Sequence, residues 1–424
     1  MRLDQCLLNP PAATGYAVAY SGGLDSTVLL HLARAQGLPG LQAIHVHHGL
    51  QPAADDWVAR AEQQCQQWGV PLTVLRVMVD AQHPQGPEAA AREARYAALC
   101  GALKPGTLLM SAHHADDQAE TVLLRLCRGT GVEGLAAMQS LTLLGAQPLW
   151  RPLLNQPRES LQAYAKAQDL RWVEDPHNQH PRYARSWLRS TAMPLLRSRW
   201  PQLDAALLRT AEHASDAAQL LQDLARDLLP TVCLPEGGLS VPGLLALKPP
   251  QRRLVLRHWL ATLGLPPVAS AVLQRLEREV LAAAPEAHPL LCWSGGEFRR
   301  YRQALHAGPP MPNLPEDFCL DWDGQQPLAL PFGLGRMHSA TPQAMQVCFG
   351  LAGVRIKPVG QAHHRTLRQL CQQAGVPPWW RSRLPIVFVN RTVVSIAARW
   401  DTAEAPALRW QFEPWLGLPA SWAD

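Results

Sequence analysis

The sequence predicts an α/β fold, in which a parallel sheet carries helices on both faces and two smaller C-terminal domains follow. Three observations support this prediction. Short apolar runs alternate with helical patterns up to about Arg189, which is typical of a parallel sheet. The chain has 424 residues and is 47% hydrophobic. Because a domain typically has about 150 residues, we expect more than one hydrophobic core. Beyond Arg189 the alternation gives way to a long helix and then to strand-rich sequence.

Four apolar runs indicate the buried strands of the sheet, and they cover residues 16–20, 41–48, 72–79 and 107–112. Helical patterns follow each run, at residues 26–36, 54–69, 87–103 and 116–129. Parallel sheets bind ligands at the carboxyl ends of their strands. The stretches SGGLDS, HVHHGL and SAHHADD all lie at such ends, so we expect them to share one pocket.

The remainder of the chain suggests three further parts. Residues 201–229 form a long amphipathic pattern, and residues 297–307 indicate a basic strand. A proline-rich stretch, PPMPNLPEDF, is typical of a linker. The final part is strand-rich, with one helix within residues 363–375. We therefore expect a catalytic domain at 1–210, a helical bridge and middle domain at 211–310, a linker at 311–334 and a basic C-terminal domain at 335–424.

The charge distribution predicts a polyanionic partner. The net charge is only +5, but the chain has four lysines among its 39 basic residues, and arginine suits phosphate and base contacts. No Asp or Glu occurs from residue 324 to residue 400. Such a basic segment is what nucleic-acid binding requires. A solvated surface with an accidental bias is the alternative.

Cysteine usage and the N-terminus favour a cytoplasmic protein. The nine cysteines never form CxxC, so we expect buried, reduced thiols. The first twenty residues lack the pattern of a signal peptide, and no apolar run is long enough for a membrane span.

The stretch SGGLDS, residues 21–26, has the layout of an anion site between a strand and a helix. Gly22 and Gly23 let the backbone approach a phosphate, and the helix N-terminus supplies free N–H groups. Neither GxxxxGK[ST] nor GxGxxG occurs here. A carboxylate beside phosphates is repulsive, so Asp25 either binds Mg²⁺ or caps the helix.

The segment HHADDQAE carries a second group of polar residues. Asp117 and Glu120 are three residues apart, which places both carboxylates on one helix face. With His113 and His114 before the helix, the group could hold Mg²⁺ or an ammonium ion. Two alternatives remain open, an acidic first turn that complements the helix dipole and a zinc site.

These motifs resemble those of a known family. SGGLDS resembles the pyrophosphate loop of the Rossmann-like N-type ATP pyrophosphatases, or PP-loop ATPases. Residues 113–135, together with AIHVHHGL, EAAAREARY, RPLL, the stretch from YAKAQDL to SWLR, and QLCQQAGVPPWW, resemble segments of the tRNA(Ile)-lysidine synthetase family in the same order. The resemblance covers residues 17–399.

The resemblance implies a two-step reaction. ATP and Mg²⁺ would serve to adenylate the oxygen at carbon 2 of the wobble cytidine, position 34, in a CAU-anticodon tRNA(Ile). Free L-lysine then displaces AMP to form lysidine. The residues implied for ATP are Ser21, Gly22, Gly23, Leu24, Asp25 and Ser26, with Asp25 placing Mg²⁺. The catalytic residues implied are Asp25, Arg92, Arg95, His113, Asp117 and Glu120, of which Asp117 and Glu120 bind lysine.

Basic residues along the chain are expected to contact the tRNA, and they are Arg182, Arg185, Arg189, Arg299, Arg300, Arg302, Arg365, Arg368 and Arg381. Trp379 and Trp380 form either a packed turn, which is the favoured interpretation, or a base-stacking surface. The chain departs from the family pattern at Ser186, where asparagine is usual, and at Arg368 and Gln369, where paired lysines are common.

Two other functions are considered. A tRNA cytidine thiolase would share the adenylation step, but such enzymes typically need CxxC pairs, which this chain lacks. A non-catalytic tRNA-binding protein would not need an intact SGGLDS loop or the pair Asp117 and Glu120. The oligomeric state stays open, and a homodimer is one possibility.

Overall fold

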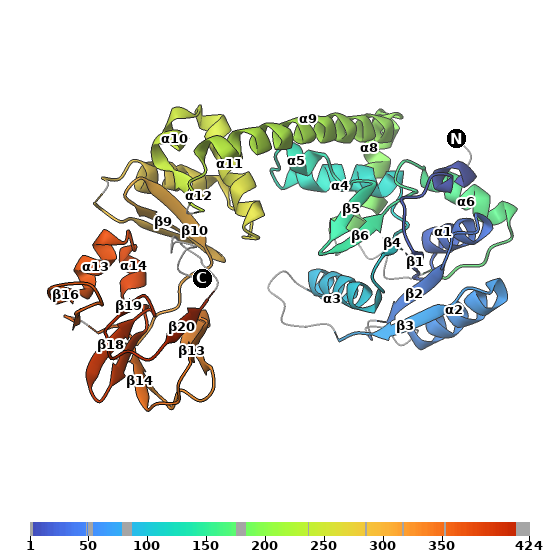
Figure 1. Cartoon of the computed structure of the whole chain (residues 1–424). Coiled ribbons are helices and arrows are strands. Elements are labelled where there is room, and N and C mark those ends of the chain that lie inside the picture. The colour runs from blue at the N-terminus through green and yellow to red at the C-terminus, as the bar shows by residue number, and fades with distance from the viewer. Residues whose placement is uncertain are drawn as a thin grey trace. The chain divides into compact units, whose positions relative to one another are not determined.

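The computed structural model describes residues 3–47, 49, 54–78, 87–174, 184–235, 237–284, 286–315, 318–351 and 353–412. His48 and Arg182 lie outside the described residues. The chain divides into two compact units, Met1–Leu220 and Leu221–Asp424 (Figure 1). Within the described part of the chain, no helix combines the length and the apolar character needed to cross a membrane.

The first unit is built on a six-stranded sheet with the strand order β3-β2-β1-β4-β6-β5 (Figure 1). Parallel pairing joins β3 to β2, β2 to β1, β1 to β4 and β4 to β6, which confirms the predicted parallel sheet. An antiparallel hairpin of β5 and β6 closes one edge, and the local sequence pattern does not predict it. The strands are β1 (Gly15–Ala19), β2 (Gln42–His47), β3 (Leu72–Arg76), β4 (Thr107–Met110), β5 (Leu141–Leu144) and β6 (Gln147–Trp150).

Helices cover both faces of this sheet because side chains along a strand alternate between the faces. Tyr16 and Val18 of β1 pack with side chains of α1, α2 and α6. Ala17 points to the opposite core, which contains Leu99 of α3. Both cores are apolar, so the central strands are buried on two sides. These helices are α1 (Leu24–Ala35), α2 (Ala54–Trp68), α3 (Pro87–Ala102) and α6 (Arg158–Ala167).

A further group of helices begins at the end of β4. Ala119 of α4 packs against Leu188 and Met193, which come from a much later part of the chain. That later part is α-helical at both ends and π-helical between. Pro194 has no N–H for the carbonyl four residues earlier, which favours a widened turn at this place. The elements are α4 (Ala115–Cys127), α7 (Ala184–Trp187), the π-helix η3 (Leu188–Ala192), α8 (Met193–Arg199) and the 30-residue α9 (Leu203–Val232).

The second unit has two apolar cores, one over residues 232–307 and one over residues 301–412. The first core is covered by a sheet of order β7-β10-β9-β8. The expected single strand at 297–307 is an antiparallel hairpin, because the chain turns at Arg302, whose φ is +54°. The elements are β7 (Leu239–Ser240), α10 (Val241–Ala246), α11 (Pro249–Thr262), α12 (Ser270–Arg275), the π-helix η4 (Leu276–Leu281), β8 (Leu290–Trp293), β9 (Gly296–Tyr301) and β10 (Ala304–Gly308).

The second core of this unit lies among short antiparallel strands. Part of the expected linker is structured, since β11 and β12 lie within residues 311–334 and pair with β14 and β13. We therefore propose a boundary between middle and C-terminal domains before β11. The elements are β11 (Cys319–Trp322), β12 (Leu328–Ala329), β13 (Arg336–Ser339), β14 (Met345–Cys348), β15 (Arg355–Ile356), β16 (Arg365–Thr366), α13 (Leu367–Gln373), α14 (Pro378–Arg381), β17 (Ile386–Val389), β18 (Thr392–Ile396), β19 (Trp400–Asp401) and β20 (Leu408–Gln411).

The PPWW turn is packed, as the favoured interpretation predicts. Trp379 is 8% exposed and Trp380 is fully buried. The ring of Trp379 lies edge-on to Tyr301 and His306 of the middle domain, with centroids 6.2 Å and 5.9 Å away. Gln369, one of the departures from the family pattern, has a local role, because its Oε1 accepts the backbone N–H of Thr366 at 3.0 Å and caps α13.

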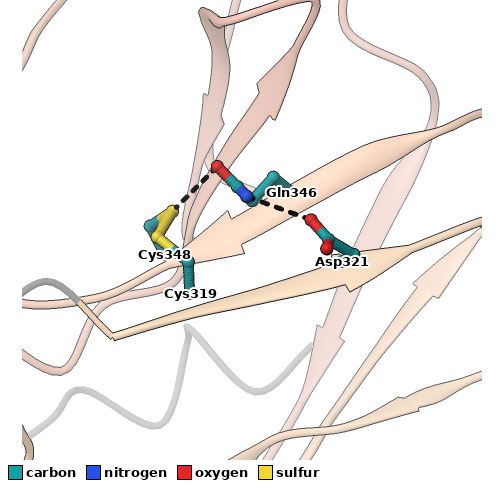
Figure 2. Close-up of a disulfide and its surroundings, with 4 residues drawn as sticks. All are labelled: Cys319, Asp321, Gln346 and Cys348. Carbon is teal, nitrogen blue, oxygen red and sulfur yellow. Dashed lines mark hydrogen bonds between the residues drawn. A yellow bond between two sulfur atoms is a disulfide. The ribbon is translucent and has the colours of Figure 1, made fainter.

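The expectation that all cysteines are reduced is wrong for one pair. Cys319 of β11 and Cys348 of β14 form a disulfide (Figure 2). The two residues stand directly opposite each other in the antiparallel ladder, with their Cα atoms 4.1 Å apart. They are 29 residues apart in sequence, so only the strand pairing brings them together. Cys65 and Cys371 are buried free thiols, and burial raises the pKa of each to about 11.

Candidate active site

The loop between β1 and α1 is held by its own hydroxyl groups. Ser26 Oγ accepts the backbone N–H of Ser21 at 3.2 Å and donates to the carbonyl of Gly23 at 3.1 Å. Gly22 has a φ of +79°, which glycine adopts without steric cost. The first N–H groups of α1 have no helical acceptor, and they follow this loop directly. The side chain of Leu24 is buried in the core, so only its backbone can face a ligand.

Asp25 lies in the first turn of α1, and its cationic partners are more than 3.5 Å away. Its nearest cations are Arg158, whose Nε is 3.9 Å from Oδ1, and His114, whose Nε2 is 3.7 Å from Oδ2. Oδ1 is buried and accepts no hydrogen bond from the described residues. Burial raises the pKa of Asp25, and these cations offset it only in part. An under-neutralised carboxylate at a phosphate loop has the chemistry that Mg²⁺ prefers.

His114 joins this loop to the acidic helix α4. Its imidazole is 1% exposed, and three carboxylates surround it. Nε2 lies 3.4 Å from Asp117 Oδ2 and 3.7 Å from Asp25 Oδ2, while Nδ1 lies 3.6 Å from Asp116 Oδ2. Burial by itself would lower the pKa of His114, but the carboxylates outweigh burial, and the pKa lies above its usual value. The carboxylates therefore favour the protonated form of His114, whose positive charge offsets the negative charge of the site.

The carboxylate of Asp116 links three helices through hydrogen bonds. Its Oδ2 accepts the backbone N–H of Arg158 at 2.9 Å, and its Oδ1 accepts Nη2 of Arg197 at 3.1 Å. Burial raises the pKa of Asp116, but the partners, His114 first, hold it well below its usual range. This carboxylate therefore connects α4 to α6 and α8.

Asp117 and Glu120 lie on one face of α4, as the spacing predicts. Glu120 is 2% exposed, and its carboxylate pairs with Nε of Arg185 at 2.9 Å and Nε of Arg189 at 2.6 Å. Asp117 pairs with Nη2 of Arg189 at 2.9 Å. Burial raises the pKa of Asp117, but nearby cations, His114 first, bring it below its usual value. The two arginines expected to contact tRNA thus lie on the two acids expected to bind lysine.

The remaining expected catalytic residues lie around the end of β4 and on α3. His113 Nδ1 is 2.9 Å from Ser111 Oγ. Burial lowers the pKa of His113 to about 3, the nearby Asp117 raises it, and Arg151, Arg185 and Arg92 lower it further. His113 is therefore neutral at pH 7. Arg92 and Arg95 lie over the ring of Tyr96, at 5.0 Å and 5.2 Å from its centroid.

Three residues of this region, Arg151, Arg158 and Arg197, are not among the sequence-predicted site residues, and His114 is predicted only as a member of the HHADDQAE group. His114 and Arg151 are both buried, at 1% and 8% exposure. Arg158 and Arg197 reach the site from α6 and α8. The sequence signal for His114 and Arg151 is their position just after the strands β4 and β6, whereas Arg158 and Arg197 lie on helices and have no such signal. Among the residues that the structure describes, no three His, Cys, Asp or Glu side chains converge as metal ligands, which gives the zinc alternative no support.

The arginines expected to contact tRNA in the second unit differ in accessibility. Arg300 is 6% exposed, and its Nη1 donates to the carbonyls of Val280, Leu281 and Ala283. This contradicts a phosphate-binding role, because the guanidinium is used inside the protein. Arg299 is also engaged, with Glu297 at 2.6 Å. Arg381 is half-buried, with Nη2 3.5 Å from the Val376 carbonyl. The exposed members of the set in this unit are Arg302, Arg365 and Arg368.

Comparisons with known protein families match three parts of the chain. Residues 2–196 match the PP-loop domain family, residues 239–306 the TilS substrate binding domain and residues 345–412 the TilS substrate C-terminal domain.

Curated relatives named tRNA(Ile)-lysidine synthase match the chain along most of its length. The Pectobacterium atrosepticum protein is 43% identical over 417 residues, which cover 95% of this chain and 94% of that protein. The protein of Xanthomonas campestris pv. campestris strain 8004 is 41% identical over 418 residues, covering 95% of this chain and 96% of that protein. The Alkalilimnicola ehrlichii protein is 44% identical over 402 residues, covering 91% and 89%.

Proposed function

Because the chain belongs to the tRNA(Ile)-lysidine synthase family, we propose that it ligates free L-lysine to carbon 2 of the cytidine at position 34 in a CAU-anticodon tRNA(Ile). The reaction consumes ATP and releases AMP and pyrophosphate. One observation carries the assignment of the site. The His114 ring lies between Asp25 of the phosphate loop and Asp117 of the acid pair, at 3.7 Å and 3.4 Å, so nucleotide chemistry and amine binding share one centre.

In the first step, the oxygen on carbon 2 of the cytidine attacks the α-phosphorus of ATP, and the bond to the β-phosphate bridging oxygen breaks. Pyrophosphate leaves with that electron pair. Ser21, Ser26 and the backbone N–H groups from Gly23 to Asp25 hold the departing phosphates. Mg²⁺, when bound at Asp25, supplies positive charge to those phosphates. Arg92 and Arg95 of α3 provide further positive charge.

In the second step, an amino group of lysine attacks carbon 2, and the bond from carbon 2 to the adenylated oxygen breaks to release AMP. An ammonium must lose a proton before it can attack. Asp117 and Glu120 hold the ammonium by charge. His113 is neutral and can accept a proton, although its low pKa makes it a weak base until the charges around it change.

The tRNA contacts proposed on the first unit are Arg185 and Arg189, together with Arg182, and those on the second unit are Arg302, Arg365 and Arg368. Exposed arginines suit phosphates because their charge is available to a polyanion. We propose that the enzyme acts in the cytoplasm, where its tRNA substrate is found. The homodimer also stays a proposal, and sedimentation velocity on the full chain separates one chain from two.

The test is incorporation of labelled lysine into a CAU-anticodon isoleucine tRNA transcript, with and without ATP. A CAU-anticodon methionine tRNA and labelled arginine are the controls. We expect ATP-dependent uptake of lysine by the isoleucine tRNA alone. AMP formation without lysine uptake would retain the adenylation step and overturn lysine as the nucleophile. Absence of both products would overturn the proposed function.

A further inference from the structure

Each oxygen of the Asp117 and Glu120 carboxylates accepts a hydrogen bond from a protein group. Glu120 Oε1 accepts Arg189 Nε at 2.6 Å, and Oε2 accepts Arg185 Nε and Arg189 Nη2, both at 2.9 Å. Asp117 Oδ1 accepts Arg189 Nη2 at 2.9 Å, with Arg185 Nη2 at 3.4 Å. Asp117 Oδ2 accepts the backbone N–H of His114 at 3.1 Å. All four carboxylate oxygens therefore already accept hydrogen bonds.

This arrangement leaves no charge for a lysine ammonium. Two carboxylates face two guanidinium groups, and both guanidiniums stay charged at pH 7, since arginine is not deprotonated in proteins. A third cation would enter a neutral cluster and meet two positive charges at close range, which is unfavourable in a partly buried site. Lysine can bind to Asp117 and Glu120 only if one or both arginines move away.

We propose that Arg185 and Arg189 close the lysine site until the phosphates of the bound tRNA draw them away, so that lysine enters only after the RNA. This inference rests on the proposed function, because it takes Asp117 and Glu120 as the lysine-binding acids. The two arginines then have two alternative partners, the acids in the free protein and phosphates in the complex. Arginine pairs with carboxylate and phosphate through the same planar fork.

Both arginines are placed to meet a partner from solvent. Their side chains are 29% and 41% exposed, whereas the acids beneath them are 13% and 2% exposed. Among the described residues, both guanidinium groups bind the acids through Nε and Nη2, which leaves Nη1 as the donor for a phosphate. Trp187, between them in sequence, is 50% exposed and offers a surface on which a base of the anticodon loop can stack.

The backbone that carries the arginines suits a local rearrangement. Arg185 lies in the four-residue α7 and Arg189 in the π-helical segment η3, which ends two residues before Pro194. A π-helical turn has poorer hydrogen-bond geometry than an α-helix and is common at functional sites. Both arginines contact the acids across the interface between α4 and this segment. A shift of the segment would therefore move both guanidinium groups away from the carboxylates at once.

The experiment measures lysine binding separately from catalysis. Equilibrium dialysis with labelled lysine is done on the full chain, with an ATP analogue that cannot be cleaved between the α and β phosphates, with and without the isoleucine tRNA transcript. We expect the tRNA to tighten lysine binding to the wild-type protein by about tenfold or more. We expect the double variant Arg185→Gln with Arg189→Gln to bind lysine without tRNA about tenfold more tightly than wild type does.

Arg199→Gln is the matched control, since Arg199 is exposed on α8 and pairs with no described carboxylate. It should leave lysine binding without tRNA unchanged. If circular dichroism shows that the double variant does not fold, the two single variants are compared with wild type in the same way. Each is expected to gain less lysine affinity than the double variant.

Three results would overturn this proposal. One is wild-type protein that binds lysine equally well with and without tRNA. Another is a folded double variant that binds no lysine even with tRNA, because the arginines would then hold lysine rather than exclude it. The third is a control variant that gains lysine binding as the double variant does. Failure of the proposed function gives a different pattern, in which wild-type protein binds no lysine under any condition and incorporates none into tRNA.

Discussion

His114 Nε2 lies 3.4 Å from Asp117 Oδ2 and 3.7 Å from Asp25 Oδ2, so one imidazole ring connects the phosphate loop to the acidic helix. This contact explains how two separate sequence motifs act as one site. It also makes His114 a positioning residue, since its ring is 1% exposed and cannot reach a substrate without a rearrangement.

Replacing His114 by Asn is expected to destabilise the first unit by about 3 kcal/mol, because it removes a buried group whose positive charge three carboxylates share. The raised pKa of His114 also predicts the pH dependence. This stabilisation is fully present below the unfolded pKa of about 6.5 and is lost as pH rises through the folded value. Thermal melts of wild type and variant from pH 5.5 to 9 should therefore converge as pH rises. A constant difference across that range would contradict the assigned charge.

Replacing Asp25 by Asn should lower the rate of catalysis without lowering the stability of the fold. Burial raises the pKa of this carboxylate, so its charge costs folding free energy, and its removal should leave the melting temperature unchanged or raised. Release of AMP and pyrophosphate should fall by about 100-fold or more, because the proposed Mg²⁺ at the phosphates would lose its carboxylate ligand. Filter binding should show unchanged affinity for tRNA. Undiminished AMP release would remove Asp25 from the mechanism.

Replacing Arg368 or Arg365 by Gln should weaken tRNA binding with little effect on folding, because both side chains are exposed. For each phosphate that a variant no longer neutralises, the slope of the logarithm of the binding constant against the logarithm of salt concentration should become shallower by about 0.9. Fluorescence anisotropy at several salt concentrations measures this slope. An unchanged slope in both variants would place the tRNA elsewhere on the protein.

Replacing Arg300 by Gln should lower the stability of the fold and leave the salt dependence of tRNA binding unchanged. The change leaves three buried carbonyls without their donor, so we expect the second unit to lose about 2 kcal/mol of stability. Because Arg300 is buried, the salt dependence of tRNA binding should not change in the folded variant. Chemical denaturation together with the same anisotropy series checks both expectations, and a shallower slope would restore Arg300 to the tRNA contacts.

The parallel sheet and the two cores of the first unit could be predicted from local patterns, because strand and helix periods are written in neighbouring residues. The same holds for Asp117 and Glu120, whose spacing alone places them on one helix face. The β5–β6 hairpin and the turn at Arg302 could not be predicted in this way. Both depend on pairing with other strands, which overrides the weak local signal of short runs.

Local sequence was enough to establish the fold class, the phosphate loop and the acid pair, because each depends on residues that are close in the chain. Only the folded structure determines which charged groups form pairs. Folding places Arg185 and Arg189 on Asp117 and Glu120, His114 among three carboxylates, Arg300 inside the second unit, and Cys319 opposite Cys348. An arginine has the same composition and charge whether it faces phosphate, carboxylate or a buried carbonyl. Its partner is set by packing between segments distant in sequence, and that packing exists only in the folded chain.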